Sequence, residues 1–383
     1  MEILKLNKIS DLVNDIFDEK YTLCDEATAP TGILLRSFDM KNGYELPSSI
    51  IAVGRAGAGV NNIPCEEYAK KGVVVFNTPG ANANAVKELV VAGLLLASRD
   101  IIGGYEYAQS LKGESEAGKL VEKNKSKFGG NEIFAKTLGV IGLGAIGRKV
   151  AEAGASLGMK VIGYDPYLTE QVKNMLPSGV KTVEKVEDLY PTCDFITLHI
   201  PYGASTKGFI GAAALSQMKD GVKLLNFARG ELVDNAALFE ALDSKKVNKY
   251  VTDFVSSDLI GRKEIIILPH LGASTEEAED NCAIMASNEL IDYIENGNIK
   301  NSVNFPNLST HRNGKNRITV GFIATDDTLN KITALVSEKV KVSATSSSIR
   351  GEIGYAIFDT DDDATSLASS LAALENVTKV RLI

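Results

Sequence analysis

The sequence predicts an α/β protein with a doubly wound parallel sheet and a separate small βαββαβ module at its C-terminal end. Three observations support this prediction. Short apolar runs alternate with helix-like stretches over most of the chain, as in parallel sheets that helices cover on both faces. One of these runs leads into a G-x-G-x-x-G turn. Residues 317–383 follow the order strand, helix, strand, strand, helix, strand, which is typical of a ferredoxin-like fold.

The composition is that of an ordinary globular protein. With 383 residues, 44% of them hydrophobic and 23% charged, the chain is expected to form two or three domains. The net charge of −8 argues against nucleic acid or an anionic membrane as a partner. No apolar run approaches the roughly 20 residues that cross a bilayer, and no secretory signal pattern is present, so a cytoplasmic location is expected. The four cysteines are scattered without metal-ligand spacing, so no metal site is predicted.

Three buried strands are predicted near the N-terminus, in "GILLRS", "SIIAVGRAG" and "GVVVFNTPG". Ligands of parallel sheets bind where loops leave the C-terminal ends of strands, which draws attention to Arg36, Ser37, Arg55 and the loop 78–84. Residues 85–101 read as a long buried helix. The stretch "LKGESEAGKLVEKNKSKFGG" after it reads as an exposed connection.

A second alternating series begins at Lys136. Its six apolar runs fit a doubly wound domain closely: "TLGVIGLG", "MKVIGYD", "DFITLHIP", "VKLLNFARG", "KYVTDF" and "EIIILPH". Ser274 and Glu277 then form a capping-box pattern at the start of a long helix that ends near Gly297. The Asn-rich residues 301–316 read as a linker to the C-terminal module.

The glycine-rich turn predicts a dinucleotide site. Gly142 permits a tight turn, Gly144 lets a pyrophosphate approach the helix N-terminus, and Gly147 lets helix and strand pack closely. Asp165 ends the next strand, 18 residues beyond Gly147, where its carboxylate is able to accept hydrogen bonds from the adenosine ribose. Its charge repels a 2′-phosphate and Pro166 follows it, so NAD is favoured over NADP. The alternative is a glycine-rich turn without a ligand.

Three polar residues follow consecutive predicted strands. Arg229 comes after "VKLLNFA", Asp253 ends "KYVTD", and His270 ends "EIIILPH". Hydride transfer at a carbinol carbon needs a base for the hydroxyl proton, a cation for the substrate's oxygens and an oriented nicotinamide. Arginine's planar fork suits a carboxylate, and histidine suits the proton. Taken singly, Arg229 could be a surface ion-pair residue and His270 a packing residue; together they indicate an active site.

The chain resembles the D-isomer-specific 2-hydroxyacid dehydrogenases. "VGRAGAGVNNI", "FNTPGANANAVKELVVAGLLLASR", "TLGVIGLGAIGRKVA", "LNFARGELVD" and "LPHLGAST" look like that family's blocks in the family's order, over roughly residues 30–305. The resemblance implies an NAD-dependent dehydrogenase that oxidises D-3-phosphoglycerate to 3-phosphohydroxypyruvate, the first step of serine biosynthesis. The alternatives are a hydroxypyruvate or glyoxylate reductase of the same family and a non-catalytic NAD-sensing scaffold.

The resemblance also implies roles for individual residues. Arg229 would bind the substrate's carboxylate and keto oxygens, His270 would be the general acid and base, and Asp253 would hold the nicotinamide carboxamide. The expected substrate-binding residues are Arg55, Gly57, Ala58 and Asn82, with Arg36 as a second candidate for the phosphate. Further cofactor contacts are expected from Ala145, Ile146, Arg148, His199, Pro201, Ala228 and Gly272.

One position departs from the family's pattern. The family usually has a glutamate five residues after the aspartate that matches Asp253, where it bonds the catalytic histidine. Here Asp258 stands at that position in the shortened loop "DFVSSDLIGRKE". A carboxylate beside the imidazolium fixes its tautomer. We therefore expect Asp258 to take this catalytic role, with Glu264 as a weaker substitute and a solvated loop acid as the alternative.

The resemblance further implies a domain plan. Residues 1–92 and 280–303 would form a discontinuous, flavodoxin-like substrate domain, and residues 93–279 an inserted Rossmann-type NAD domain. Residues 304–316 would be a linker and 317–383 an ACT-like module. The effector-loop pattern of that module is poorly matched at "ATDDTLNKI", so assembly is as plausible a role for it as binding of an amino acid. The resemblance suggests a homodimer or homotetramer.

Overall fold

The computed structural model describes residues 1–383. The chain divides into two compact units, Met1–Asn82 with Glu276–Ile383, and Ala83–Thr275. The boundaries expected from the sequence lie at 92 and 280; the first of these would cut through the helix α2 (Ala83–Ser98). No helix in either unit combines the length and the apolar character that a membrane crossing requires.

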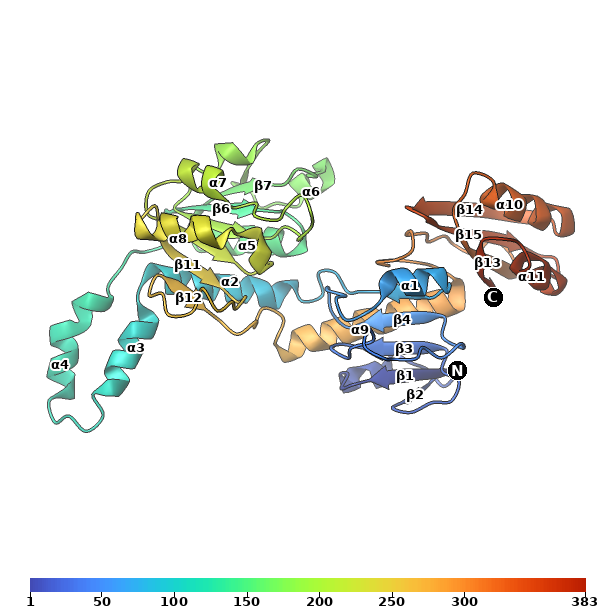
Figure 1. Cartoon of the computed structure of the whole chain (residues 1–383), viewed down its shortest axis with the longest axis horizontal. Helices are drawn as coiled ribbons and strands as arrows, with labels where there is room; N and C mark the ends of the chain where they lie inside the picture. Colours follow the sequence, from blue (N-terminus) through green and yellow to red (C-terminus); the bar gives the residue numbers. More distant parts are fainter. The chain divides into compact units, whose positions relative to one another are not determined.

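The first unit contains a five-stranded parallel sheet in the order β2-β1-β3-β4-β5. This is the flavodoxin-like order that the family resemblance implies. Its strands are β1 (Glu2–Leu6), β2 (Thr22–Cys24), β3 (Gly32–Leu35), β4 (Ala52–Arg55) and β5 (Val74–Phe76), and its helical segments are η1 (Asp11–Asp15), α1 (Cys65–Lys70) and α9 (Glu276–Asn296). The α9 helix returns to this sheet and packs on β4, although it lies more than two hundred residues away in the sequence (Figure 1).

The second unit is a seven-stranded parallel sheet in the order β12-β11-β10-β9-β6-β7-β8. Its strands are β6 (Thr137–Ile141), β7 (Lys160–Tyr164), β8 (Lys181–Val183), β9 (Phe195–Leu198), β10 (Val222–Asn226), β11 (Val247–Thr252) and β12 (Ile265–Ile267). Between them lie α5 (Ala145–Ser156), α6 (Glu170–Asn174), η3 (Val186–Asp188), α7 (Ala212–Gln217), η4 (Gly230–Leu232) and α8 (Asn235–Asp243). The doubly wound fold is confirmed, and the short edge strand β8 is the one strand of this unit that the apolar runs do not predict.

A helical hairpin replaces part of the expected connection. The chain continues from α2 into α3 (Ile101–Ser110), α4 (Ala117–Asn124) and η2 (Lys125–Phe128), and Figure 1 shows α3 and α4 standing away from the sheet of their unit. Residues 111–130, expected as an exposed connection, contain no buried residue, but α4 and η2 within them were not predicted. The ring of Tyr107 lies 5.4 Å from that of Phe128, and its hydroxyl donates to the carbonyl of Leu120, so the two helices hold each other.

The C-terminal module has the expected βαββαβ order. It consists of β13 (Asn316–Ile323), α10 (Thr328–Lys339), β14 (Val342–Arg350), β15 (Ile353–Thr360), α11 (Thr365–Ala372) and β16 (Val377–Leu382), with an antiparallel sheet in the order β14-β15-β13-β16. Side chains of α10 and α11 share one apolar core with Ile318, Val320 and Phe322 of β13. Because residues alternate along a strand, the other face of the sheet is left for a second contact.

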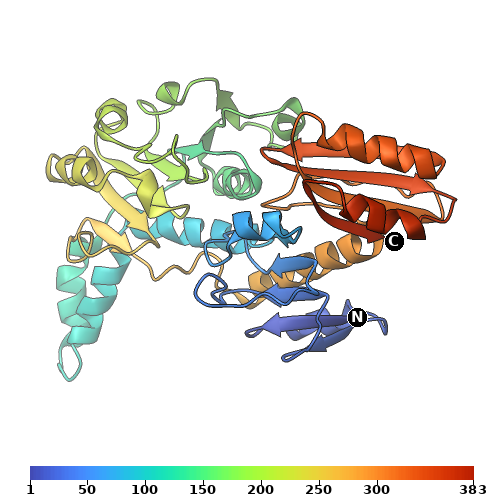
Figure 2. The same cartoon turned by 45° about the vertical axis from the view of Figure 1, so that its right-hand side comes forward.

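That second face packs on the end of α9, and both views place the C-terminus near this helix end (Figure 2). Tyr355 donates to the carbonyl of Gly297 at 2.7 Å, and Arg381 donates to the carbonyls of Tyr293 and Ile294. The last carbonyls of a helix lack partners within the helix, so these donors cap α9 from another part of the chain. Arg317 adds a fourth donor, to the carbonyl of Asn296 at 2.8 Å.

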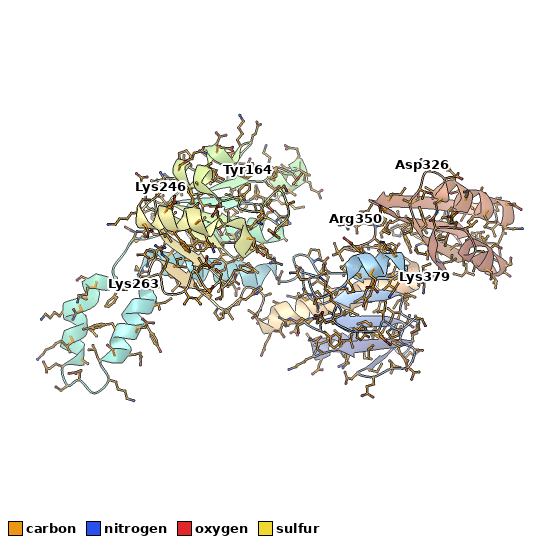
Figure 3. The ribbon with its side chains drawn as sticks, viewed as in Figure 1. Tyr164, Lys246, Lys263, Asp326, Arg350 and Lys379 are labelled. Carbon is orange, nitrogen blue, oxygen red and sulfur yellow. The ribbon has the colours of Figure 1, made fainter.

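The segment 304–316, expected as a linker, is tied to both of its neighbours. Phe305 is buried in the core that contains Tyr293 and Tyr355. Two residues labelled in Figure 3 add contacts between the C-terminal module and the rest of the first unit. Arg350 donates to the carbonyl of Ser302 at 2.8 Å, and Lys379 lies against Gly72, in the turn after α1. The module is thus an integral part of the first unit.

Candidate functional site

The glycine-rich turn lies between β6 and α5. Gly142 has a φ of 94°, and a side chain on it would meet the carbonyl of His199. A Cβ on Gly147 would lie 1.8 Å from the carbonyl oxygen of Gly142. Gly144, by contrast, faces open space and caps α5 without a side-chain hydrogen bond. The first amides of α5 are therefore exposed beside a position that has no side chain, which suits an anionic ligand.

Asp165 is fixed against this turn. The amide of Gly142 donates to the carbonyl of Tyr164, which ends β7 and is labelled in Figure 3. One carboxylate oxygen of Asp165 accepts from the amide of Leu143 at 2.8 Å, and the other accepts from the amide of Tyr167 at 2.9 Å. Each oxygen keeps a free lone pair. The geometry holds an acid next to the glycine turn, as a dinucleotide's ribose requires.

His199 follows β9 beside the same turn. Burial lowers the pKa of its imidazole to about 3, so the ring is neutral at physiological pH. Nε2 lies 3.0 Å from the hydroxyl of Thr197, while Nδ1 is buried without a hydrogen-bond partner. An orphaned polar atom of this kind, beside the glycine turn, leaves a hydrogen bond for a ligand to complete.

Arg229 follows β10 in a loop that a buried asparagine holds. The side chain of Asn226 donates to the carbonyl of Arg229 at 2.8 Å and accepts from the amide of Ala228 at 3.1 Å. The guanidinium of Arg229 is half-buried, and its Nη1 donates to the carbonyl of Ala228 at 2.6 Å. The remaining guanidinium donors are those that could form a fork for a carboxylate.

Asp253 follows β11 and is 1% exposed. Its Oδ2 accepts from the amide of Gly272 at 3.0 Å, whereas its buried Oδ1 has no partner. Burial raises the pKa of Asp253, and the bond from Gly272 and the charges of His270 and Arg229 oppose that shift. Because β11 is hydrogen-bonded in parallel between β10 and β12, the residues that follow these three strands lie at the same edge of the sheet.

His270 follows β12 and is exposed. Its amide donates to the carbonyl of Asp253 at 3.0 Å, which ties the two strand ends together. The backbone of His270 has a φ of 48°, a left-handed conformation that few non-glycine residues adopt and that is often found at functional sites. The imidazole is not turned into the core, so it is accessible to a substrate.

Phe254 belongs to this site but was missed from the sequence. Its ring centroid lies 4.9 Å from that of His270 and 5.8 Å from the guanidinium carbon of Arg229. The available signal was its position directly after Asp253, at the end of a strand. An aromatic residue there was read as part of an apolar run.

Asp258 is not brought to His270. Its carboxylate is exposed and accepts from the side-chain amide of Asn235, at the start of α8, at 2.8 Å. The loop from Ser256 to Gly261 turns toward α8, and the short aspartate side chain follows it. The expectation that Asp258 bonds the imidazole therefore finds no support in the geometry, which fits the solvated loop acid instead.

The expected substrate residues lie in the first unit, with Asn82 at its boundary. Arg36 follows β3 and pairs with Glu279 of α9. Arg55 ends β4, and its Nε donates to the carbonyl of Arg36 at 3.1 Å. Gly57 has a φ of 155°, and a side chain on it would collide with the guanidinium of Arg55. The glycine thus makes room for an arginine at the C-terminal edge of this sheet.

The remaining expected cofactor residues surround the glycine turn and the strand ends of the second unit. Ala145 and Ile146 begin α5, and Ala228 and Gly272 contact Asn226 and Asp253 through their amides. Pro201 is exposed two residues after His199. Arg148, also on α5, is turned toward Met175, with its Nη1 2.9 Å from the sulfur.

Residues 92–272 match the family model described as the NAD binding domain of D-isomer specific 2-hydroxyacid dehydrogenases. A D-3-phosphoglycerate dehydrogenase of Methanocaldococcus jannaschii is 35% identical over 277 residues, which are 71% of this chain and 51% of the relative. One of Haemophilus influenzae is 31% identical over 354 residues, 88% of this chain and 82% of the relative. The chain thus spans about half the length of the first relative and most of the second.

A solved structure agrees with these matches. The NAD⁺-bound 3-phosphoglycerate dehydrogenase of Entamoeba histolytica superposes with a TM-score of 0.60 at 26% identity, covering 79% of this chain and 98% of that one. The matched region includes the glycine turn and the three strand ends described above. In the present chain, the open space at Gly144 and the unpartnered Oδ1 of Asp253 are compatible with the NAD⁺ that the Entamoeba histolytica structure contains.

Proposed function

Because this chain belongs to the D-isomer-specific 2-hydroxyacid dehydrogenase family, we propose that it oxidises D-3-phosphoglycerate to 3-phosphohydroxypyruvate with NAD. Two relatives that bear the name D-3-phosphoglycerate dehydrogenase support the choice of substrate. The reaction would supply the 3-phosphohydroxypyruvate from which serine is made. The observation that carries the proposal is the meeting of Arg229, Asp253 and His270 at three adjacent strand ends.

The residues of the second unit have distinct tasks in this proposal. The guanidinium of Arg229 binds the substrate carboxylate through its free donors. The imidazole of His270 accepts the proton of the C2 hydroxyl as the carbonyl forms. The unpartnered Oδ1 of Asp253 would accept a hydrogen bond from the carboxamide of the nicotinamide, and bound NAD would supply the acceptor for the hydride.

Arg55 and Arg36 of the first unit are the candidates for binding a phosphate group. Arg55 and Arg36 stand at the C-terminal edge of its sheet, where ligands of such sheets bind. Arg36 is paired with Glu279, so a phosphate would compete with that carboxylate for the guanidinium. This competition favours a doubly charged ligand over a bare hydroxy acid.

The test is the rate of NADH formation on a panel of 2-hydroxy acids with and without a phosphate. We expect D-3-phosphoglycerate to give the highest kcat/KM. His270→Asn should lower kcat by about 10²–10⁴-fold, as removal of a general base does. The matched control is His311→Asn, which removes an exposed histidine of the first unit and should leave kcat unchanged.

Three outcomes would overturn parts of the proposal. A preference for glycolate, D-glycerate or D-lactate would make the chain a reductase or dehydrogenase of unphosphorylated acids. Near wild-type turnover in His270→Asn would remove the histidine from the mechanism. NADH binding without turnover of any acid on the panel would indicate a sensing scaffold.

A further inference from the structure

We propose that the ring of Phe254 positions both Arg229 and His270. This inference rests on the proposed function, because it assigns a role within the same site. The ring centroid lies 4.9 Å from the imidazole, with the ring planes at 50°, and 5.8 Å from the guanidinium carbon. One side chain thus contacts both groups to which the proposed reaction assigns a task.

The sheet topology explains why residue 254 occupies this position. The strand β11 lies hydrogen-bonded between β10 and β12, so the residues that follow β11 emerge between Arg229 and His270. Thr252 sets the direction of the chain as it leaves the strand. Its hydroxyl donates to the carbonyl of Asn226 at 2.9 Å and accepts from the amide of Phe254 at 3.1 Å.

Packing does not account for the aromatic residue. Phe254 is only half-buried and belongs to none of the apolar cores of the second unit, whose members lie on both faces of the sheet. Gly230 lies close to it, since a Cβ on Gly230 would be at an ordinary contact distance of 3.4 Å from the Cβ of Phe254. The ring therefore stands at the surface of the site, with Arg229 and His270 as its ring contacts.

The chemistry of the ring suits both neighbours. The face of an aromatic ring carries partial negative charge and attracts guanidinium and imidazolium groups. His270 has no side-chain hydrogen bond in the structure, and the carboxylate of Asp258 is bonded to Asn235 instead. The ring contact is then what restricts the orientation of the imidazole. It also gives the guanidinium and the imidazole one rigid neighbour in common, which limits how far either group can move.

The experiment compares Phe254→Leu, which keeps apolar bulk, with Phe254→Tyr, which keeps the ring. The leucine variant should lose on the order of tenfold in kcat and raise KM for the hydroxy acid, because two aromatic contacts to functional groups are lost. The tyrosine variant should stay within about threefold of wild type. The Kd of NADH, measured by fluorescence titration, should be unchanged in both. The matched control is Phe239→Leu, since Phe239 lies under Arg262 at 4.7 Å in the same unit, away from the site.

A second measurement does not depend on turnover. The chain has three histidines, so the imidazole signal of His270 is identified by its loss in His270→Asn. Ring stacking shifts that signal upfield in a histidine-selective NMR spectrum. The shift should disappear in Phe254→Leu and persist in Phe254→Tyr and Phe239→Leu.

The outcomes separate this inference from the proposed function. If no acid on the panel is oxidised but the NMR signal responds to the ring as expected, the proposed function fails while the ring contact stands. If the enzyme is active and the leucine and tyrosine variants have equal kcat and equal NMR shifts, the positioning role of Phe254 is wrong. A leucine variant that loses NADH affinity to the same degree as kcat would show a structural role instead, and would also overturn the inference.

Discussion

Replacing Arg317 with methionine should destabilise the first unit by about 3–5 kcal/mol, the usual cost of removing one partner of a buried ion pair. Arg317 and Asp359 are 0% and 2% exposed, with Nε 2.7 Å from Oδ1 and Nη2 2.9 Å from Oδ2. Nη1 also donates to the carbonyl of Asn296, at the end of α9. Methionine keeps most of the volume but leaves the carboxylate of Asp359 buried without its counter-charge.

The ion pair contributes its full effect at neutral pH. Burial by itself raises the pKa of Asp359, but hydrogen bonds from Arg317 and from the amide of Asn313 outweigh it, and the net shift is downward. A carboxylate whose folded pKa is lowered adds stability above its unfolded pKa, and that stability is lost as the pH falls through the folded pKa. The comparison of variant and wild type therefore belongs near pH 7, well above the acid range.

Calorimetry and urea unfolding followed by circular dichroism would measure the loss, since the chain has no tryptophan for fluorescence. A loss of this size should lower the Tm of the first unit on the order of 10 °C. Lys331→Met is the matched control, because Lys331 and Asp327 form an exposed pair on α10 at 3.0 Å. It should change the stability by less than about 1 kcal/mol.

A double variant isolates the buried charge. Arg317→Met combined with Asp359→Asn removes both charges and should recover most of the lost stability. A Tm of Arg317→Met within about 2 °C of wild type would refute the reasoning, since it would mean a loss below about 1 kcal/mol. So would a double variant no more stable than the single one, because the cost would then lie in the lost hydrogen bonds to α9 and not in the unpaired carboxylate.

Two further predictions concern a buried acid and the glycine turn. Burial raises the pKa of Glu289 to about 8, although Asn301 donates to one of its oxygens. The side chain is therefore protonated in the folded protein at neutral pH. The stability that this protonation provides is lost as the pH rises from about 4.5 to 8. The difference in unfolding free energy between Glu289→Gln and wild type should therefore shift in favour of the variant by several kcal/mol as the pH rises from 5 to 8.5. A difference that does not change with pH would contradict this assignment. Gly147→Ala should lower both the Tm and NADH affinity, because its Cβ would meet the carbonyl of Gly142, whereas Gly144→Ala, in open space with an ordinary φ, should keep the Tm and weaken NADH binding alone. Equal Tm values for these two alanine variants would show that the turn tolerates a side chain at 147.

The local patterns of the sequence were sufficient for the fold and for part of the site. Apolar runs of strand length, the glycines of the turn and the acid at Asp165 all express constraints between near neighbours in the chain. The flavodoxin-like sheet, the doubly wound sheet and the βαββαβ module were confirmed. Arg229, Asp253 and His270 could be grouped because parallel strands end at the same edge, which is a rule of topology and requires no coordinates.

The sequence patterns did not predict the hairpin of α3 and α4. Residues 111–130 are rich in lysine and glycine, and neither helix buries a side chain. No apolar periodicity therefore predicts these two helices. They are held by Tyr107, which joins one helix to the other and to Phe128. Such a contact depends on the path of the loop between the helices, and the sequence does not reveal that path.

By itself, the sequence predicted most of the strands, the dinucleotide turn and the sheet edge at which the polar residues follow the strands, because each follows from spacing along the chain. Only the tertiary structure decided that Asp258 bonds Asn235, that Phe254 stands between Arg229 and His270, and that the C-terminal module caps α9. These features depend on the direction of a side chain as it leaves a loop and on contacts between residues far apart in sequence. A different backbone turn in the loop after β11 would direct Asp258 elsewhere, and the sequence pattern would be the same.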